Sequence, residues 1–185
     1  MGNSVITVRG LCKSYKQYIR YLKELSDAFF ELTKIENGAV ELHTEQVNLS
    51  NLLTETLLEQ HTWIAERNIK TDFAITDGIL VQTDRHRLTR ILQNLMSNAH
   101  KYAADRFSVT LGREGDRVKL RVSNTLADSA PPDMDSVFEP FYRMDARTAG
   151  GSGLGLYVVK LLCDRLGWTV SAKLHDAVFS VTLIL

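Results

Sequence analysis

Two asparagines and a lysine fall on one face of a predicted helix. The stretch RILQNLMSNAHKY, residues 90–102, places Asn94, Asn98 and Lys101 three or four residues apart, so a helix stacks them on one side. Asparagine is a mediocre helix former, because its side chain competes for nearby backbone groups. An amide oxygen is a neutral ligand for Mg²⁺, and a lysine ammonium is a point charge for phosphate. These residues suit an anionic or metal-bridged ligand, and taken alone they suit equally well a polar margin where the core meets water.

A glycine-rich stretch, AGGSGLGL at residues 149–156, directly precedes another predicted helix. Glycines let backbone N–H groups approach a ligand, and the first turn of a helix adds its positive dipole end, so the pattern predicts an anion site. A lone glycine-rich turn is more often a flexible loop than a phosphate cradle. Here FEPFYR, residues 138–143, lies between the amide-bearing helix and the glycines. The three features in this order support one another.

Apolar residues three or four apart predict the helices that position these features. A long amphipathic helix is expected over residues 14–36, ended by Asn37 and Gly38. We interpret it as an exposed helix that pairs between chains, and packing on its own domain is the alternative. The other predicted helices are residues 48–68, capped by Asn48, the helix around 90–102, and residues 154–166, stopped by Gly167. The predicted buried stripe of the central helix consists of Leu88, Ile91, Leu92, Leu95, Met96 and Ala99.

Alternating apolar and polar residues predict strands between and after these helices. Strands are expected at residues 72–75 and 79–83, and a hairpin joins residues 107–111 to 118–122. A second hairpin pairs WTVSAKL with AVFSVTL around His175 and Asp176. From residue 48 onward, helices mixed with antiparallel hairpins predict an α+β fold, a two-layer α/β sandwich.

The composition narrows the class of protein. A hydrophobic fraction of 44% and only three prolines indicate a globular chain. Lys+Arg and Asp+Glu both number 22, so no global charge bias indicates nucleic acid or an anionic membrane as a partner. Cys12 and Cys163 match no metal-ligand spacing and are interpreted as reduced thiols of a cytoplasmic domain. No apolar run approaches the ~18 residues of a membrane span, so we expect no membrane contact, whether or not the parent protein is membrane-anchored.

The three features resemble the sequence boxes of sensor histidine kinases. NLMSNAHKY resembles the N box, FEPFYR the F box and GGSGLGL the G2 box of their ATP-binding catalytic domain, which belongs to the superfamily of gyrase, Hsp90, histidine kinases and MutL. Upstream, YLKELSDAFFELTKIENGAVEL resembles the second helix of the dimerisation and phosphotransfer domain. The resemblance implies the Bergerat ATP-binding fold, with a mixed, mostly antiparallel sheet, helices on one face and a long helix in front. It divides the chain into an atypical start (1–13, a tag or a truncation), a dimerisation helix with linker (14–44) and the catalytic domain (45–185).

The resemblance also assigns roles to residues around an ATP molecule. Asn94 would coordinate the Mg²⁺ that bridges the ATP phosphates, while Asn98 and Lys101 would contact the phosphates or order the metal's waters. Tyr102 would stack near the adenine or ribose. The phosphates would also receive backbone N–H groups from Gly151, Gly153, Leu154 and Gly155.

Residues 139–152 would form the lid over ATP. Arg143 and Arg147 are the candidate phosphate partners in this lid, and Phe138 and Phe141 would anchor it by packing. Plain core aromatics would satisfy the same pattern.

The chain departs from the family at the G1 box, which has the form Asp-x-Gly-x-Gly. Counting back from Phe138 without a gap, the corresponding stretch is NTLAD, residues 124–128. Asn124 therefore stands where the family reads adenine with an aspartate, and neither glycine is present. An amide oxygen still accepts from the adenine amino group, but without the charge assistance of a carboxylate. We expect nucleotide binding that is weaker, not different in kind.

The second departure concerns the phosphoacceptor, a histidine followed by an acidic residue on the first dimerisation helix. The five histidines are His43, His61, His86, His100 and His175, so none precedes residue 43. The resemblance implies an ATP-binding catalytic fragment that, in a homodimer formed through the N-terminal helix, donates the γ-phosphoryl group to a histidine for transfer to a response regulator. Alternatives are a pseudokinase or binding module of the same fold, favoured by the altered G1 stretch, and an anti-sigma-type serine kinase, which the N-terminal helix disfavours.

Overall fold

The computed structural model describes residue 26 and residues 42–127, 132–144 and 152–185. The predicted helix over 14–36 and the atypical start at 1–13 thus lie, apart from residue 26, outside the described residues. Within the described ranges the elements follow in the order β1 (Thr44–Asn48), α2 (Leu49–Leu58), α3 (His61–Glu66), β2 (Lys70–Ile75), β3 (Leu80–Asp84), α4 (Arg85–Tyr102), β4 (Arg106–Glu114), β5 (Arg117–Thr125), α5 (Gly155–Leu166), β6 (Thr169–His175) and β7 (Val178–Ile184).

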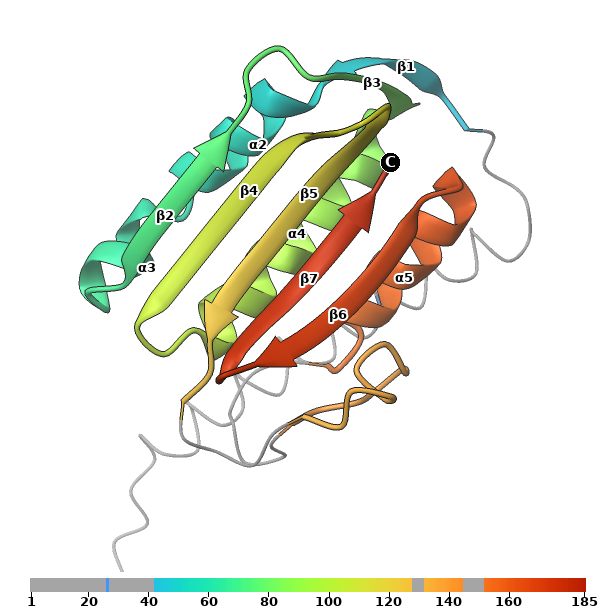
Figure 1. Ribbon diagram of the computed structural model, residues 1–185. Helices are drawn as coiled ribbons and strands as arrows, with labels where there is room; N and C mark the ends of the chain where they lie inside the picture. The colour runs from blue at the N-terminus through green and yellow to red at the C-terminus, as the bar shows by residue number, and fades with distance from the viewer. Residues whose placement is uncertain (1–25, 27–41, 128–131, 145–151) are drawn as a thin grey trace, which may run out of the picture.

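A five-stranded sheet in the order β2-β4-β5-β7-β6 forms one layer of the domain. β2 pairs with β4 in parallel, and all other neighbours in this sheet are antiparallel. The helices cover one face of the sheet, with α4 and α5 side by side behind its centre and right edge (Figure 1). The prediction of a two-layer α+β sandwich with a mixed, mostly antiparallel sheet is therefore confirmed. A small antiparallel pair, β1 with β3, forms a separate sheet, and this pairing was not predicted from the sequence.

α4 carries the apolar stripe that the sequence predicts. Its buried residues are Leu88, Ile91, Leu92, Leu95, Met96 and Ala99. The helix begins earlier than the stretch that suggested it, because the side chain of Asp84 accepts a hydrogen bond from the Arg87 N–H at 3.0 Å and caps the first turn. Burying this stripe against the sheet fixes the rotation of the helix, and with it the direction of its polar face.

The predicted single helix over residues 48–68 is wrong, because the chain forms two helices with a break at Glu59 and Gln60. Side chains at the break bind the carbonyls that lose their helical partners: Gln60 Nε2 donates to the Thr56 carbonyl and His61 Nδ1 to the Leu58 carbonyl. The change of direction lets Trp63 of α3 stack on His100 of α4, with ring centroids 5.0 Å apart. Tertiary packing thus overrides continuous helical propensity.

Both predicted hairpins are confirmed. The β4–β5 strands are longer than expected and turn at Gly115, which has a φ of 63°. The β6–β7 turn lies one residue later than predicted, at Asp176 and Ala177, whose φ values of 47° and 62° fit a tight two-residue hairpin turn.

In the part of the chain that the structure describes, no helix is long and apolar enough to cross a membrane. Cys163 is a free, buried thiol on α5, and burial raises the pKa of this thiol to about 12. It therefore stays protonated and unreactive at neutral pH, as expected of a thiol that serves packing.

Candidate functional site

A cavity of about 320 Å³ opens between the polar face of α4, the start of α5, the segment that leads from β5 to α5, and Phe179 of β7. Its size is within the range of about 300–1,000 Å³ that is usual for small-molecule sites. The residues that line it are Arg90, Gln93, Asn94, Ser97, Asn98, Lys101, Tyr102, Leu126, Pro132, Val137, Tyr142, Met144, Ser152, Gly153, Leu154, Gly155, Leu156, Val158 and Phe179.

α4 supplies the polar wall of this cavity. The structure brings together the four helix residues that the sequence singles out, Asn94, Asn98, Lys101 and Tyr102. It adds three that sequence reasoning missed, Arg90, Gln93 and Ser97. A signal for them was available, since stepping back four residues from Asn94 gives Arg90, and two such steps from Lys101 give Ser97 and Gln93.

The start of α5 forms the opposite wall, where Gly153, Leu154 and Gly155 line the cavity as predicted. Its N-cap residue, Leu154, makes no side-chain capping bond, and the Ser152 hydroxyl accepts from the Leu154 N–H at 3.4 Å. A Cβ placed on Gly155 would lie 3.6 Å from Asn94 Oδ1, so the first turn of α5 packs closely against α4. The N–H groups in the first turn of a helix have no helical acceptor, so a helix start that faces a cavity offers backbone donors and a positive dipole end to an anion.

Asn94 carries a buried amide donor. Among the described residues, its Nδ2 atom has no hydrogen-bond partner although it is shielded from solvent. Buried polar groups in native proteins are nearly always paired, so such a group indicates a missing partner. The Nδ2 donor suits a phosphate oxygen, and a half-turn of the amide about χ2 presents Oδ1, the atom that a magnesium ion requires.

The charged side chains in the described lining of the cavity are all positive. Its described lining includes two cations, Arg90 and Lys101, and neither an aspartate nor a glutamate. No group of three His, Cys, Asp or Glu side chains in the described ranges could hold a metal ion. A cation in this cavity would therefore depend on amide oxygens and on the charge of the ligand itself, whereas an anion meets fixed positive groups.

Gly153, just before α5, packs against the backbone of the FEPFYR segment. It has a φ of 72°, and a Cβ at this position would lie 2.6 Å from the Phe141 carbonyl carbon and 2.7 Å from the Tyr142 carbonyl oxygen. The Tyr142 hydroxyl accepts a hydrogen bond from the Asp133 N–H at 2.6 Å. Phe138 packs against the core as expected, but the prediction that Phe141 anchors the lid by packing is wrong: this side chain is 59% exposed, with a φ of 65°.

Not every predicted site residue lines the cavity. Arg143 is half-buried between the lining residues Tyr142 and Met144 but does not line the cavity itself. Gly151 and Arg147 lie outside the described residues.

Asn124 borders the cavity without lining it. The residue is 4% exposed, and its Nδ2 donates to the Thr125 carbonyl at 3.2 Å. Its cross-strand partner Phe179 and the nearby Leu126 both line the cavity.

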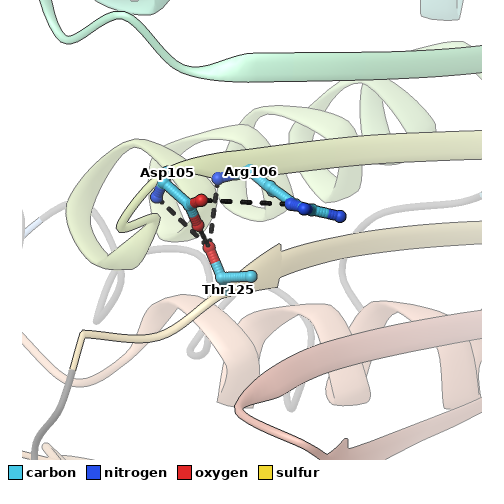
Figure 2. A network of polar contacts seen from close by, with 3 residues as sticks. All are labelled: Asp105, Arg106 and Thr125. Carbon is cyan, nitrogen blue, oxygen red and sulfur yellow. Dashed lines mark hydrogen bonds and ion pairs between the residues drawn. The ribbon is translucent and has the colours of Figure 1, made fainter.

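The strand end that carries Asn124 is held by the next residue, Thr125 (Figure 2). The Thr125 hydroxyl accepts from the N–H groups of Asp105 and Arg106, at 3.2 and 3.0 Å, and donates to Asp105 Oδ1 at 2.6 Å. The Ala104 N–H donates to the Thr125 carbonyl at 2.9 Å. These bonds tie the end of β5 to the segment that follows α4, so Asn124 and Tyr102 are held at the same end of the cavity.

We expect Thr125→Val to lower the free energy of unfolding by about 1 kcal/mol, because valine keeps the shape but removes the acceptor of two N–H groups. Chemical denaturation measures this change. Thr110→Val, at an exposed position on β4, is the matched control and should have a smaller effect. Equal losses in the two variants would show that the hydroxyl of Thr125 does not hold the strand end.

The C-terminal end of α4 is fixed from the other side by Arg67. Its guanidinium donates to the carbonyls of His100, at 2.6 Å, and of Ala103, and it lies over the Trp63 ring, 6.0 Å from the centroid. Carbonyls at a helix end lack helical partners, so a bidentate cation is well matched to them. The contact orients the last turn of α4, which presents Lys101 and Tyr102 to the cavity.

Comparison with known families and proteins yields consistent matches. The family described as histidine kinase-, DNA gyrase B-, and HSP90-like ATPase matches residues 83–185. The sensor protein VanSC of Enterococcus gallinarum is 30% identical over 174 residues, which cover 90% of this chain and 48% of that protein. The circadian input-output histidine kinase CikA of Synechococcus elongatus is 32% identical over 172 residues, covering 85% of this chain and 23% of that protein. The chain thus spans less than half the length of these relatives.

Solved structures share the fold. The Acinetobacter baumannii histidine kinase AdeS superimposes with a TM-score of 0.78 at 20% identity, covering 98% of this chain and 86% of that one. Full-length ShkA, solved in complex with AMPPNP, gives a TM-score of 0.77 at 22% identity and covers 99% of this chain and 39% of that one. Histidine kinase ThkA, solved in complex with the response regulator protein TrrA, gives 0.68 at 22% identity, with 92% of this chain and 51% of that one covered.

Proposed function

Because the chain belongs to the family of histidine kinase-, DNA gyrase B- and HSP90-like ATPases, we propose that its cavity binds Mg-ATP and presents the γ-phosphoryl group for transfer. The observation that carries this proposal is the cavity between α4 and α5, whose described lining has two cations, no carboxylate and the first turn of α5. Such a site is complementary to a polyphosphate.

The polar wall of α4 provides the groups that would hold the phosphates and the metal. Asn94 would coordinate Mg²⁺ through Oδ1, and Asn98 and Lys101 would contact the phosphates or the metal's waters. A magnesium ion neutralises the charge that develops on the phosphates during transfer. The backbone N–H groups of Gly155 and its neighbours, together with Arg143 and Arg147 of the lid, complete the proposed set, and Gly151, Gly153 and Leu154 belong to the same loop.

The other end of the cavity suits a nucleobase. Leu126 and Phe179, which lie next to Asn124, supply apolar surface there, and Tyr102 supplies an aromatic ring. Asn124 borders this end, with its Nδ2 engaged by the Thr125 carbonyl, so its oxygen is the atom left to accept from the adenine amino group.

In the whole protein, the γ-phosphoryl group would pass to a histidine of a dimerisation domain and then to the receiver domain of a response regulator. ThkA, which shares the fold, was solved with such a regulator. We place the domain in the cytoplasm, within a homodimer formed through the segment that resembles a dimerisation helix. Positioning and charge neutralisation dominate phosphoryl transfer, which fits a cavity built from amides, cations and N–H groups.

A binding module without kinase activity is the competing function. The observation in its favour is the altered G1 stretch, where Leu126 replaces a glycine and its side chain lines the cavity. The three sequence boxes and the family match over residues 83–185 speak against a module without kinase activity. They show common ancestry, which an inactive member of the family would share.

Amide hydrogen exchange with and without Mg-ATP tests the proposal. We expect slower exchange in the first turn of α5, because the N–H groups there have no helical acceptor and would bind phosphate. The first turn of α2 is the internal control, since the Asn48 side chain already accepts from the Asn51 N–H at 3.0 Å. Exchange in α5 that ignores Mg-ATP would contradict the proposed site.

Restoring an acid at the G1 position tests the base end. We expect Asn124→Asp to tighten ATP binding by an amount on the order of 1 kcal/mol, because a charge-assisted bond replaces a neutral one. GTP binding should stay unchanged or weaken, since guanine presents a carbonyl where adenine presents its amino group. Parallel ATP and GTP titrations of both proteins measure the effect. Equal shifts for the two nucleotides would remove Asn124 from base recognition.

A further inference from the structure

Arg90 lines the cavity although neither the asparagine pattern nor the sequence boxes include it. It lies one turn before Asn94 on α4 and is half-buried. Arg87, three residues earlier, has its guanidinium 3.6 Å from the capping carboxylate of Asp84 and does not line the cavity. The neighbouring Arg85 is exposed and also lies outside the cavity lining. Of these three arginines of α4, Arg90 alone faces the site.

The direction of the site along α4 determines what Arg90 can reach. Tyr102 lies at the base end, because the segment after α4 is hydrogen-bonded to Thr125 at the end of β5. The first turn of α5 meets α4 at Asn94. With a rise of about 1.5 Å per residue, Arg90 is about 6 Å beyond Asn94 and about 18 Å from Tyr102 along the helix axis.

A ligand whose base lies at the Tyr102 end would pass Lys101 and Asn98 first, then Asn94, and Arg90 last. The terminal group of an extended nucleotide is its last phosphate. An arginine guanidinium offers a planar fork of donors that matches two phosphate oxygens, and its charge is permanent.

We propose that Arg90 binds the terminal phosphate of a nucleoside triphosphate and makes the cavity prefer ATP to ADP. This inference rests on the proposed ATP site and adds a residue that separates substrate from product. Only the triphosphate reaches Arg90, so the contact strengthens binding of ATP and not of ADP. The site therefore releases the diphosphate readily once the γ-phosphoryl group has left.

Calorimetric titration of the chain with ATP and with ADP, at saturating Mg²⁺, tests the role of Arg90. Arg90→Gln keeps a polar side chain of similar length and removes the charge. We expect it to weaken ATP binding about tenfold, the scale of one hydrogen-bonded charge, and to change ADP binding less than about twofold. Arg85→Gln is the matched control, because it removes the same charge from an exposed position of the same helix, and it should change neither affinity by more than about twofold.

The outcomes separate the two proposals. If the unaltered chain binds ATP but Arg90→Gln weakens ATP and ADP equally, or leaves ATP unchanged, the assignment of Arg90 to the terminal phosphate is overturned and the nucleotide site stands. If Arg90→Gln and Arg85→Gln weaken ATP binding equally, Arg90 acts only through its long-range charge, and the assignment of Arg90 to the terminal phosphate is overturned as well. If the unaltered chain binds neither nucleotide, the nucleotide site fails and the role of Arg90 fails with it. A circular dichroism melt of each variant confirms that the fold is retained.

Discussion

Gly153→Ala is expected to weaken nucleotide binding by roughly tenfold or more, because a 1 Å displacement of binding groups is enough to cost that much. Gly153 has a φ of 72°, and an added Cβ would lie 2.6 Å from the Phe141 carbonyl carbon and 2.8 Å from its Cα. These are backbone atoms, so no side-chain rotation relieves the clash. The FEPFYR segment and the start of α5 must move apart, and the N–H groups of α5 move with them.

Gly78→Ala separates this clash from backbone strain. Gly78 has a φ of 69°, but a Cβ there would meet nothing within 4 Å. Both alanines pay a left-handed penalty of about 1–2 kcal/mol, and only the one at Gly153 adds overpacking of about 1–3 kcal/mol. We expect Gly78→Ala to lower the melting temperature slightly and to leave nucleotide affinity unchanged. Wild-type affinity in Gly153→Ala would show that the FEPFYR segment does not position the start of α5.

Asn94→Ala is expected to remove most of the enhancement that Mg²⁺ gives to ATP binding, about tenfold or more for a lost ligand to the metal. It should not lower the melting temperature of the nucleotide-free chain, because Nδ2 of Asn94 is a buried donor without a partner in the described structure. Removing an unsatisfied buried group is neutral or stabilising. This combination of lost binding and retained stability distinguishes a ligand-binding amide from a structural one.

Calorimetry at several Mg²⁺ concentrations and a thermal melt without nucleotide measure both quantities. Ser97→Ala is the control, since Ser97 lines the same cavity one turn away from Lys101 and has no assigned metal role. A drop in the melting temperature of Asn94→Ala would mean that the amide has a structural partner. If Mg²⁺ enhances ATP binding equally in Asn94→Ala and in the unaltered chain, a residue other than Asn94 coordinates the metal.

The helix that carries the site could be predicted almost completely from the sequence. The apolar stripe from Leu88 to Ala99 has one helical period over three turns, and its burial dictates where Asn94, Asn98 and Lys101 point. Gly167 as the end of α5 was predictable for a similar local reason, since its φ of 73° favours glycine. Local chemistry and global packing agree at these positions.

The features that could not be predicted depend on tertiary contacts. The break at Gln60 accompanies the stacking of Trp63 on His100, a residue nearly forty positions away, and the apolar periodicity of residues 48–68 does not show it. The sequence predicts a packed Phe141, yet its side chain is 59% exposed and its backbone lies against Gly153, a contact between distant segments that local pattern does not show. Arg90 could not be predicted as a site residue, because an arginine near the start of a helix is normally interpreted as a solvated charge.

The central claim is that the cavity between α4 and α5 is a magnesium-dependent ATP site, and a calorimetric titration of the unaltered chain with ATP, with and without Mg²⁺, tests it most directly. We predict one saturable site per chain that binds ATP weakly without Mg²⁺ and at least about tenfold more tightly with it, because the metal ion would bridge the phosphates and the protein. No saturable binding at millimolar ATP, in either condition, would contradict the claim and identify the domain as a module that retains the fold without the nucleotide.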